Sequence, residues 1–194
     1  MPNDNKPKHL TIKEPSAWIT RFASLVPQGG TVLDLACGGG RNSRHFLERG
    51  YKIVAVDRNT DAVDDLATHG RAEIVTADLE DGSPWPFEGR RFDGVVVTNY
   101  LYRPLLDILV NSLNDGGVFI YETFARGNEE FARPRNPDHL LIAGELLDLA
   151  KGRLHVVAYE HGRKSETPLP GVVQRICATK PFDFDAVLAF PLAP

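Results

Sequence analysis

The chain has 194 residues, of which 42% are hydrophobic and 25% charged, a composition that fits one globular domain with a single core. Its formal net charge of −4 and its pI near 5.9 argue against a broad basic face and disfavour nucleic acid as a partner. We expect a cytoplasmic protein without membrane contact, because the sequence shows neither a membrane-spanning apolar run nor the apolar core of a signal peptide. We expect it to be a monomer or a homodimer.

The chain divides into a short polar arm, one domain and a tail. Residues 1–10 are polar and contain prolines, which predicts a loose arm before a domain at 11–180. Residues 15–26 place apolar side chains at helical spacing and predict a first helix. The segment 181–194 is apolar and rich in proline, so we expect it to lie on the domain or on another subunit.

Apolar strand-like runs and helical segments alternate along the domain. We expect strands at 31–35, 52–56, 73–76, 92–98, 117–123, 154–160 and 172–179. We expect further helices at 41–49, 60–69, 103–113 and 138–150. This alternation predicts an α/β fold with a Rossmann-like, doubly wound sheet that is mostly parallel and ends in an antiparallel C-terminal strand. A ligand would lie at the carboxyl ends of the strands.

The stretch 31–57 carries the strongest functional pattern. An apolar run ends near Asp34, a glycine-rich turn with Gly38 and Gly40 follows, and a second apolar run ends at Asp57. Such a unit holds a nucleoside, with an acid placed to accept hydrogen bonds from ribose hydroxyls. Ser43 stands where the nicotinamide fingerprint has glycine or alanine, so the pattern points away from a dinucleotide.

The stretch Asp34-Leu-Ala-Cys-Gly-Gly-Gly resembles motif I of the class I S-adenosylmethionine (SAM) methyltransferases, and Ala77-Asp78-Leu79 resembles their adenine-contacting segment. Cys37-Gly-Gly-Gly-Arg-Asn-Ser, followed by Gly50-Tyr51, is similar to the small bacterial methyltransferases of the tellurite-resistance type. The resemblance covers about residues 10–180. It implies the class I methyltransferase fold and SAM as the cofactor.

The resemblance also implies roles for individual residues. Asp34, Gly38 and Gly40 would contact the methionine part of the cofactor, and Asp57 would bind the ribose. Asn42, in the same motif, would also bind the cofactor. Arg58 would flank the adenine, whose edge Asp78 and Leu79 would read. Asn99 would lie near the sulfonium, and Trp18 would cover the cofactor.

Residues later in the chain are candidates for the acceptor pocket. Tyr100 and Tyr102 either form an electron-rich pocket wall or pack in the core, and Arg103 follows them directly. Arg133, Arg135 and His139 come after a predicted strand, in or just beyond a long loop; they either clamp an anion or form a solvated loop neutralised by Glu129 and Glu130. Glu122 is either a base or a buried acid paired with an arginine. The histidines show no metal-ligand spacing, so no metal is expected.

The predicted function is methyl transfer from SAM to a small-molecule nucleophile. A soft acceptor, such as a thiol or a chalcogen oxyanion, needs no strong base, whereas an amine or hydroxyl would need Glu122 or His139. Two alternatives stay open: a methyltransferase that acts on protein or RNA, and a SAM-binding regulatory protein that performs no chemistry.

Overall fold

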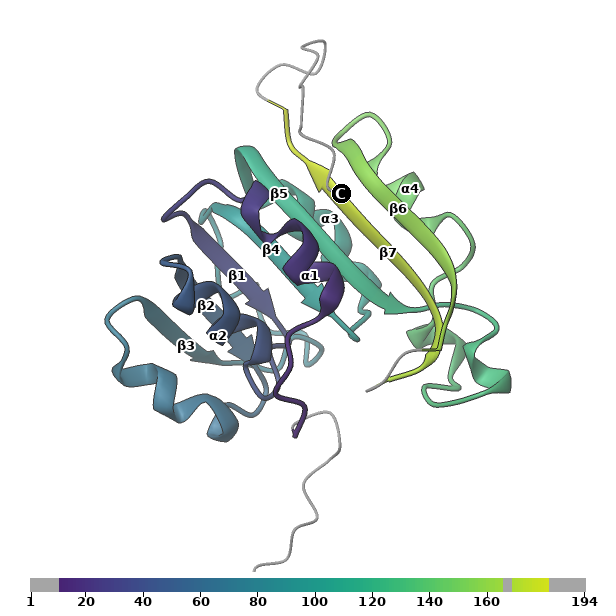
Figure 1. Ribbon diagram of the computed structural model, residues 1–194, viewed down its shortest axis with the longest axis horizontal. Helices are drawn as coiled ribbons and strands as arrows, with labels where there is room; N and C mark the ends of the chain where they lie inside the picture. The colour runs from purple at the N-terminus through teal and green to yellow at the C-terminus, as the bar shows by residue number, and fades with distance from the viewer. Residues whose placement is uncertain (1–10, 166–168, 182–194) are drawn as a thin grey trace, which may run out of the picture.

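The computed structural model describes residues 11–165 and 169–181 (Figure 1). Its strands are β1 (Thr31–Leu35), β2 (Lys52–Asp57), β3 (Ala72–Thr76), β4 (Phe92–Thr98), β5 (Leu113–Phe124), β6 (His155–Lys164) and β7 (Gly171–Thr179). The α-helices are α1 (Ala17–Phe22), α2 (Arg41–Glu48), α3 (Arg103–Asn111) and α4 (Glu145–Ala150). Short 3-10 helices are η2 (Ala23–Leu25), η3 (Asp61–Thr68), η4 (Asn128–Glu130) and η5 (Pro137–His139).

The strands form one sheet in the order β3-β2-β1-β4-β5-β7-β6. The pairs from β3 to β5 are parallel, and β7 runs antiparallel to both of its neighbours. The predicted sheet, mostly parallel with an antiparallel C-terminal strand, is therefore confirmed. The strand order reverses between β1 and β4, which places the topological switch point, and hence the expected ligand crevice, beyond the carboxyl ends of these two strands.

Helices cover both faces of the sheet. Figure 1 shows α1 and α2 on the near face and α3 and α4 behind it. Apolar residues alternate along the central strands, so that Val32 and Val96 pack with α1, α2 and η3 whereas Leu33 and Val97 pack with α3 and α4. Because both faces are covered, the central strands are buried almost completely.

Two predicted helices differ from the structure. The segment expected as a helix at 60–69 is the 3-10 helix η3, whose buried residues Val63 and Leu66 are three apart and so match three residues per turn. The helix expected at 138–150 begins only at Glu145. Leu141 forms a bridge with Ala125 instead, so the chain is extended where a helix was expected.

The expected arm at 1–10 lies outside the described residues, as does all but the first residue of the expected tail, so the domain boundaries stay predictions. Among the described helices, none is long and apolar enough to cross a membrane.

Candidate functional site

The glycine-rich turn after β1 is fastened to the end of β2. The backbone N–H of Cys37 donates to the carbonyl of Val56 (3.0 Å), and the N–H of Gly38 donates to Oδ2 of Asp57 (2.9 Å). Gly40 has a φ of +71°, and a Cβ there would come within 2.4 Å of Cγ1 of Val63. Glycine is therefore required at position 40, and α2 can begin directly behind a tight turn.

Two residues at this edge of the sheet adopt a left-handed backbone. Ala36, after β1, has a φ of 52°, and Asn99, after β4, has a φ of 58°; they are the non-glycine residues with positive φ in the described part of the chain. Such backbone costs about 1–3 kcal/mol per residue and gathers at functional sites. The N–H of Asn99 donates to the carbonyl of Glu122, which ties β4 to β5 at the same edge (2.9 Å).

A cleft of about 1090 Å³ lies along the carboxyl ends of β1 to β5. Nine of its lining residues were singled out from the sequence: Gly38, Asp57, Arg58, Asp78, Leu79, Asn99, Tyr100, Arg133 and His139. The structure thus brings together side chains that are separated by up to a hundred positions in the chain. This is the crevice that the switch point between β1 and β4 predicts.

Asp57 retains hydrogen-bonding capacity toward the cleft. Its Oδ2 accepts from the N–H of Gly38 and its Oδ1 from the N–H of Asn59 (3.1 Å), and the residue is half-buried. A carboxylate offers about four acceptor positions, so capacity remains for hydroxyl donors of a ligand. The same side chain therefore supports the glycine-rich turn and faces the cleft.

Asp34 lies beneath the turn and does not line the cleft. It is 1% exposed, and its Oδ2 accepts a hydrogen bond from Oγ of Ser43 in α2 (2.6 Å). Burial raises the pKa of Asp34 to about 6, against the lowering effect of the Ser43 hydrogen bonds. Gly40, the next predicted site residue, also serves the turn rather than the cleft surface.

Trp18 and Asn42 belong to the core and not to the cleft wall. Trp18 is 2% exposed, and its Nε1 donates to the carbonyl of Ile176 in β7 (3.1 Å), so it is not placed to cover a ligand. Asn42 is equally buried; it accepts from the N–H of Ser16 and donates to Oγ1 of Thr98 (both 3.1 Å). Asn42 therefore orients Thr98, which does line the cleft.

Glu122 is a buried acid held by two cations. Arg175 lies 3.2 Å from its Oε2, and Lys164 lies 3.5 Å from its Oε1, which also accepts from the hydroxyl of Ser16. Of the two interpretations left open by the sequence, the structure places Glu122 in the ion pair, with arginine coming from β7 rather than from the loop. It does not line the cleft and is not placed to act as a base there.

The two candidate tyrosines, Tyr100 and Tyr102, line different cavities. Tyr100 lines the cleft, and its buried hydroxyl oxygen has no hydrogen-bond partner among the described residues. Burial raises the pKa of Tyr100, with a further contribution from the nearby Glu80 carboxylate, so its hydroxyl stays protonated. Tyr102 instead lines a neighbouring cavity of about 490 Å³ together with Trp85, and the two cavities share the segment 77–79.

Only some of the basic residues predicted for the acceptor pocket line the cleft. Arg133 and His139 line the cleft, whereas Arg135 and Arg103 do not. Arg103 forms an ion pair with Glu145, its Nε 2.7 Å from Oε1, so its charge is already neutralised. Among the described residues, no ion pair links Arg133 or Arg135 to Glu129 or Glu130, and both arginines are exposed.

Sequence reasoning missed part of the cleft wall. The missed lining residues include Arg41, Glu80, Thr98, Thr123, Phe124, Pro134 and Leu169. Most of them follow directly from elements already identified, since Arg41 begins α2 and Thr123 and Phe124 end β5. Leu169 carries no comparable signal, because it reaches the cleft from the segment between β6 and β7. Within the described residues, no cluster of three or more His, Cys, Asp or Glu side chains is placed to hold a metal ion.

Sequence comparison finds a methyltransferase pattern in part of the chain. Residues 32–117 match the family model described as a methyltransferase domain. The ubiquinone biosynthesis O-methyltransferase of Paraburkholderia xenovorans (strain LB400) is 34% identical over 76 residues. That match covers 39% of this chain and 32% of the relative, so the chain spans about a third of the length of that protein.

Structural comparison gives the same fold. TehB from Haemophilus influenzae superposes with a TM-score of 0.67 at 18% identity, over 86% of this chain and 62% of that one. The 1,6-didemethyltoxoflavin-N1-methyltransferase from Burkholderia thailandensis superposes with a TM-score of 0.60 at 19% identity, over 86% and 79% of the two chains. That enzyme was solved with 1,6-didemethyltoxoflavin and S-adenosylhomocysteine bound. The predicted α/β fold is confirmed, and TehB and the Burkholderia thailandensis enzyme share it.

Proposed function

We propose that this chain, a member of the class I SAM-dependent methyltransferase family, binds SAM in the cleft and transfers its methyl group to a small-molecule acceptor. One observation carries the proposal: the glycine-rich turn, Asp57 and Asp78 border a single cleft of about 1090 Å³ that continues to the loop after β5. A cleft of this size accommodates a nucleoside cofactor and leaves room for a second small molecule.

The lining residues fit the cofactor in the order of the strands. The methionine part lies by Gly38 and the start of α2, which has no side-chain cap and so offers free N–H groups. The ribose lies by Asp57, whose free acceptor positions face its hydroxyls. The adenine lies by Asp78 and Leu79 after β3, with Arg58 beside it. Asp34 and Gly40 support the turn from below.

Bound SAM supplies an already activated methyl group. What remains for the protein is to align an acceptor with that carbon and to exclude water, which accounts for about 7–11 kcal/mol of a barrier in well-oriented systems. Asn99, at the switch point, borders the centre of the cleft, and Phe124 and Leu169 form an apolar boundary on the β5 side. Glu122 is held by its ion pairs and is not available as a base, whereas His139 borders the cleft.

A small acceptor is favoured over a protein or RNA. The described strands belong to a single sheet, and the chain carries a net charge of −4. The Burkholderia thailandensis enzyme, which shares the fold, was solved with 1,6-didemethyltoxoflavin and S-adenosylhomocysteine bound. These points support a small-molecule acceptor for this chain as well.

The first prediction concerns cofactor choice. The chain should bind SAM and S-adenosylhomocysteine, and should not bind NAD, because Ser43 replaces the third glycine of the nicotinamide fingerprint and Asp34 lies beneath the turn where a pyrophosphate would lie. Isothermal titration calorimetry with each nucleotide measures this directly. Tight NAD binding without S-adenosylhomocysteine binding would contradict the proposed function.

The second prediction concerns Asp57. Replacing it by alanine should weaken S-adenosylhomocysteine binding by about 1–3 kcal/mol, or roughly five- to 150-fold, because charge-assisted hydrogen bonds to the ribose are lost. Asp57→Asn is the matched variant, since its side-chain oxygen still accepts from the N–H of Gly38 and preserves the turn. An unchanged dissociation constant in both variants would show that the ribose does not lie here.

A further inference from the structure

The loop between β5 and α4 is a fixed part of the cleft wall. Asn128 is fully buried in it; its Nδ2 donates to the carbonyl of Pro134 (3.0 Å), and its Oδ1 accepts from the N–H of Val172 in β7 (3.2 Å). One buried amide therefore fastens the backbone next to Arg133 to the sheet. Figure 1 shows this loop beside the end of the β6–β7 hairpin.

Hydrogen bonds from Arg103 hold the backbone on both sides of His139. Arg103, at the start of α3, donates to the carbonyl oxygens of Asp138 (2.7 Å) and Leu140 (2.9 Å), the two residues that flank His139. Glu145 of α4 pairs with the same guanidinium and keeps it in place. Arg103 is thus a positioning residue: it does not line the cleft, but it fixes the backbone that presents His139 to the cleft.

The charge of this wall is not neutralised within the protein. Among the described arginines, four have a guanidinium group without a hydrogen bond, ion pair or ring contact: Arg58, Arg126, Arg133 and Arg135. Three of the four lie on this loop. Arg133 is the one of those three that lines the cleft, with His139 on the same wall. An unpaired cation beside a cleft attracts an anionic ligand.

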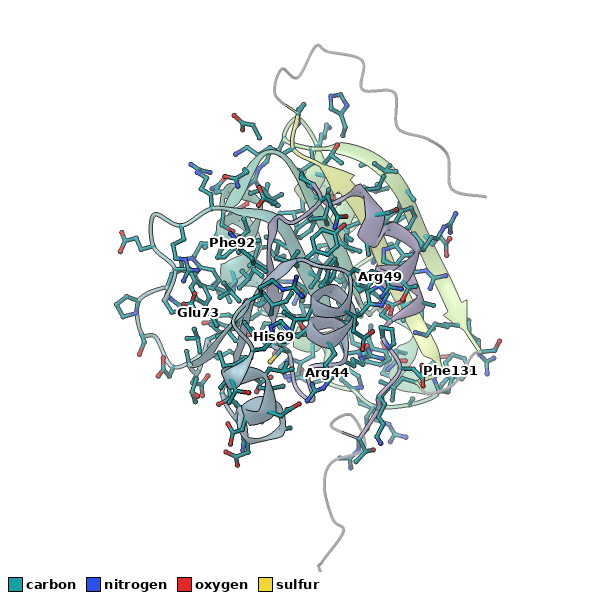
Figure 2. The ribbon with its side chains drawn as sticks, turned by 60° about the vertical axis from the view of Figure 1, so that its left-hand side comes forward. Arg44, Arg49, His69, Glu73, Phe92 and Phe131 are labelled. Carbon is teal, nitrogen blue, oxygen red and sulfur yellow. The ribbon has the colours of Figure 1, made fainter. Side chains whose placement is uncertain are left out.

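The acids of the cleft lie toward its other end. Asp57, Asp78 and Glu80 follow β2 and β3, whereas the loop follows β5 on the far side of the switch point. Figure 2 shows the corresponding separation: Glu73 of β3 and Phe131 of the loop lie on opposite sides of the molecule. The basic wall therefore faces the part of the cleft that the cofactor assignment leaves for the acceptor. Apolar atoms of Phe124, Pro134 and Leu169 adjoin it.

We propose that the methyl acceptor is a small organic carboxylate with an apolar body, whose carboxylate binds Arg133 and His139 and whose body packs on Phe124, Pro134 and Leu169. This inference rests on the proposed function, since it assigns the cofactor to the acidic end of the cleft. The guanidinium of Arg133 offers two parallel donors to a carboxylate, and the imidazole of His139 has at least one N–H donor in either protonation state.

The test is an acceptor screen with matched pairs of compounds. Each apolar carboxylic acid that carries a hydroxyl, thiol or amine is compared with its own primary amide, which keeps the body and removes the charge. Formation of S-adenosylhomocysteine is measured with SAM in excess. We expect at least one acid to be methylated with a kcat/KM about tenfold or more above that of its amide.

Single substitutions test whether Arg133 is responsible for the preference for acids over amides. Arg133→Ala should remove the preference for the acid, mainly through KM, and leave S-adenosylhomocysteine affinity within about twofold of the parent. Arg133→Lys should restore part of the preference, because it returns the charge without the planar donor pair. Arg126→Ala is the matched control, an unpaired arginine on the same loop that does not line the cleft, and it should behave as the parent does.

Three outcomes would overturn the inference while leaving the proposed function intact. The first is equal turnover of acids and amides, and the second is binding of S-adenosylhomocysteine with neither methylation nor calorimetric binding of any acid. The third is a large loss of S-adenosylhomocysteine affinity in Arg133→Ala. The last result would assign Arg133 to the carboxylate of the cofactor. Absence of S-adenosylhomocysteine binding in the parent would instead refute the proposed function, and the inference with it.

Discussion

Replacing Arg175 by methionine is expected to lower the free energy of unfolding by about 3 kcal/mol, measured by urea denaturation. Arg175 pairs with Glu122, which is 2% exposed, and its guanidinium also stacks over Trp18 at 4.7 Å from the ring centroid. Without it, the partners of the buried carboxylate among the described residues are Lys164 and the hydroxyl of Ser16. Breaking a buried pair costs much because it leaves a charge in a low-dielectric interior.

Two further variants make this prediction specific. Adding Glu122→Gln to Arg175→Met removes the stranded charge and should recover a substantial part of the lost stability. Arg153→Met is the matched control, since Arg153 pairs with Asp107, whose side chain is 77% exposed, and should cost less than about 1 kcal/mol. Equal losses in Arg175→Met and Arg153→Met, or no recovery in the double variant, would show that burial of Glu122 does not govern stability.

Much of the fold follows from patterns that are local in the sequence. Apolar runs bounded by glycine and proline located the seven strands, because each buried strand must be apolar whatever its partners are. The glycine-rich turn and Asp57 were recognisable for the same reason: a tight turn and a strand-end acid are fixed by neighbouring residues. Helix type was less accessible, since η3 differs from an α-helix only by the three-residue spacing of Val63 and Leu66.

The outer parts of the site depend on contacts between distant segments, which a single sequence does not contain. The sequence places Glu122 at a strand end, but its partners Lys164 and Arg175 come from β6 and β7, over forty positions later. Trp18 was expected over the cofactor from the family resemblance, whereas in the structure its indole points toward β7. The separate roles of Arg103 and Arg133 likewise appear only once α3 and the loop are adjacent.

The buried acid beneath the turn should make stability depend on pH. Asp34 has a pKa of about 6 in the folded state, against 3.8 for the ordinary carboxyl, because burial disfavours its charge. Between about pH 4 and pH 6 the folded state therefore binds more protons than the unfolded state, and stability falls as the pH rises. The difference of about two pKa units corresponds to roughly 3 kcal/mol of stability lost at neutral pH.

Asp34→Asn removes this titration. The free energy of unfolding of Asp34→Asn relative to the parent, measured with urea, should therefore increase by about 2–3 kcal/mol from pH 4 to pH 8. Ser43→Ala acts in the opposite direction: it deletes the hydroxyl that donates to Asp34, so its loss of stability should be larger above pH 6 than below pH 4. A pH-independent difference between Asp34→Asn and the parent would contradict the raised pKa.

The ionised Asp34 side chain lowers stability at neutral pH, which is typical of residues that serve function. Under the proposed function, Asp34 supplies negative potential beneath the positively charged methionine part of SAM. Asp34→Asn should then bind SAM more weakly at pH 8 even though it folds more stably.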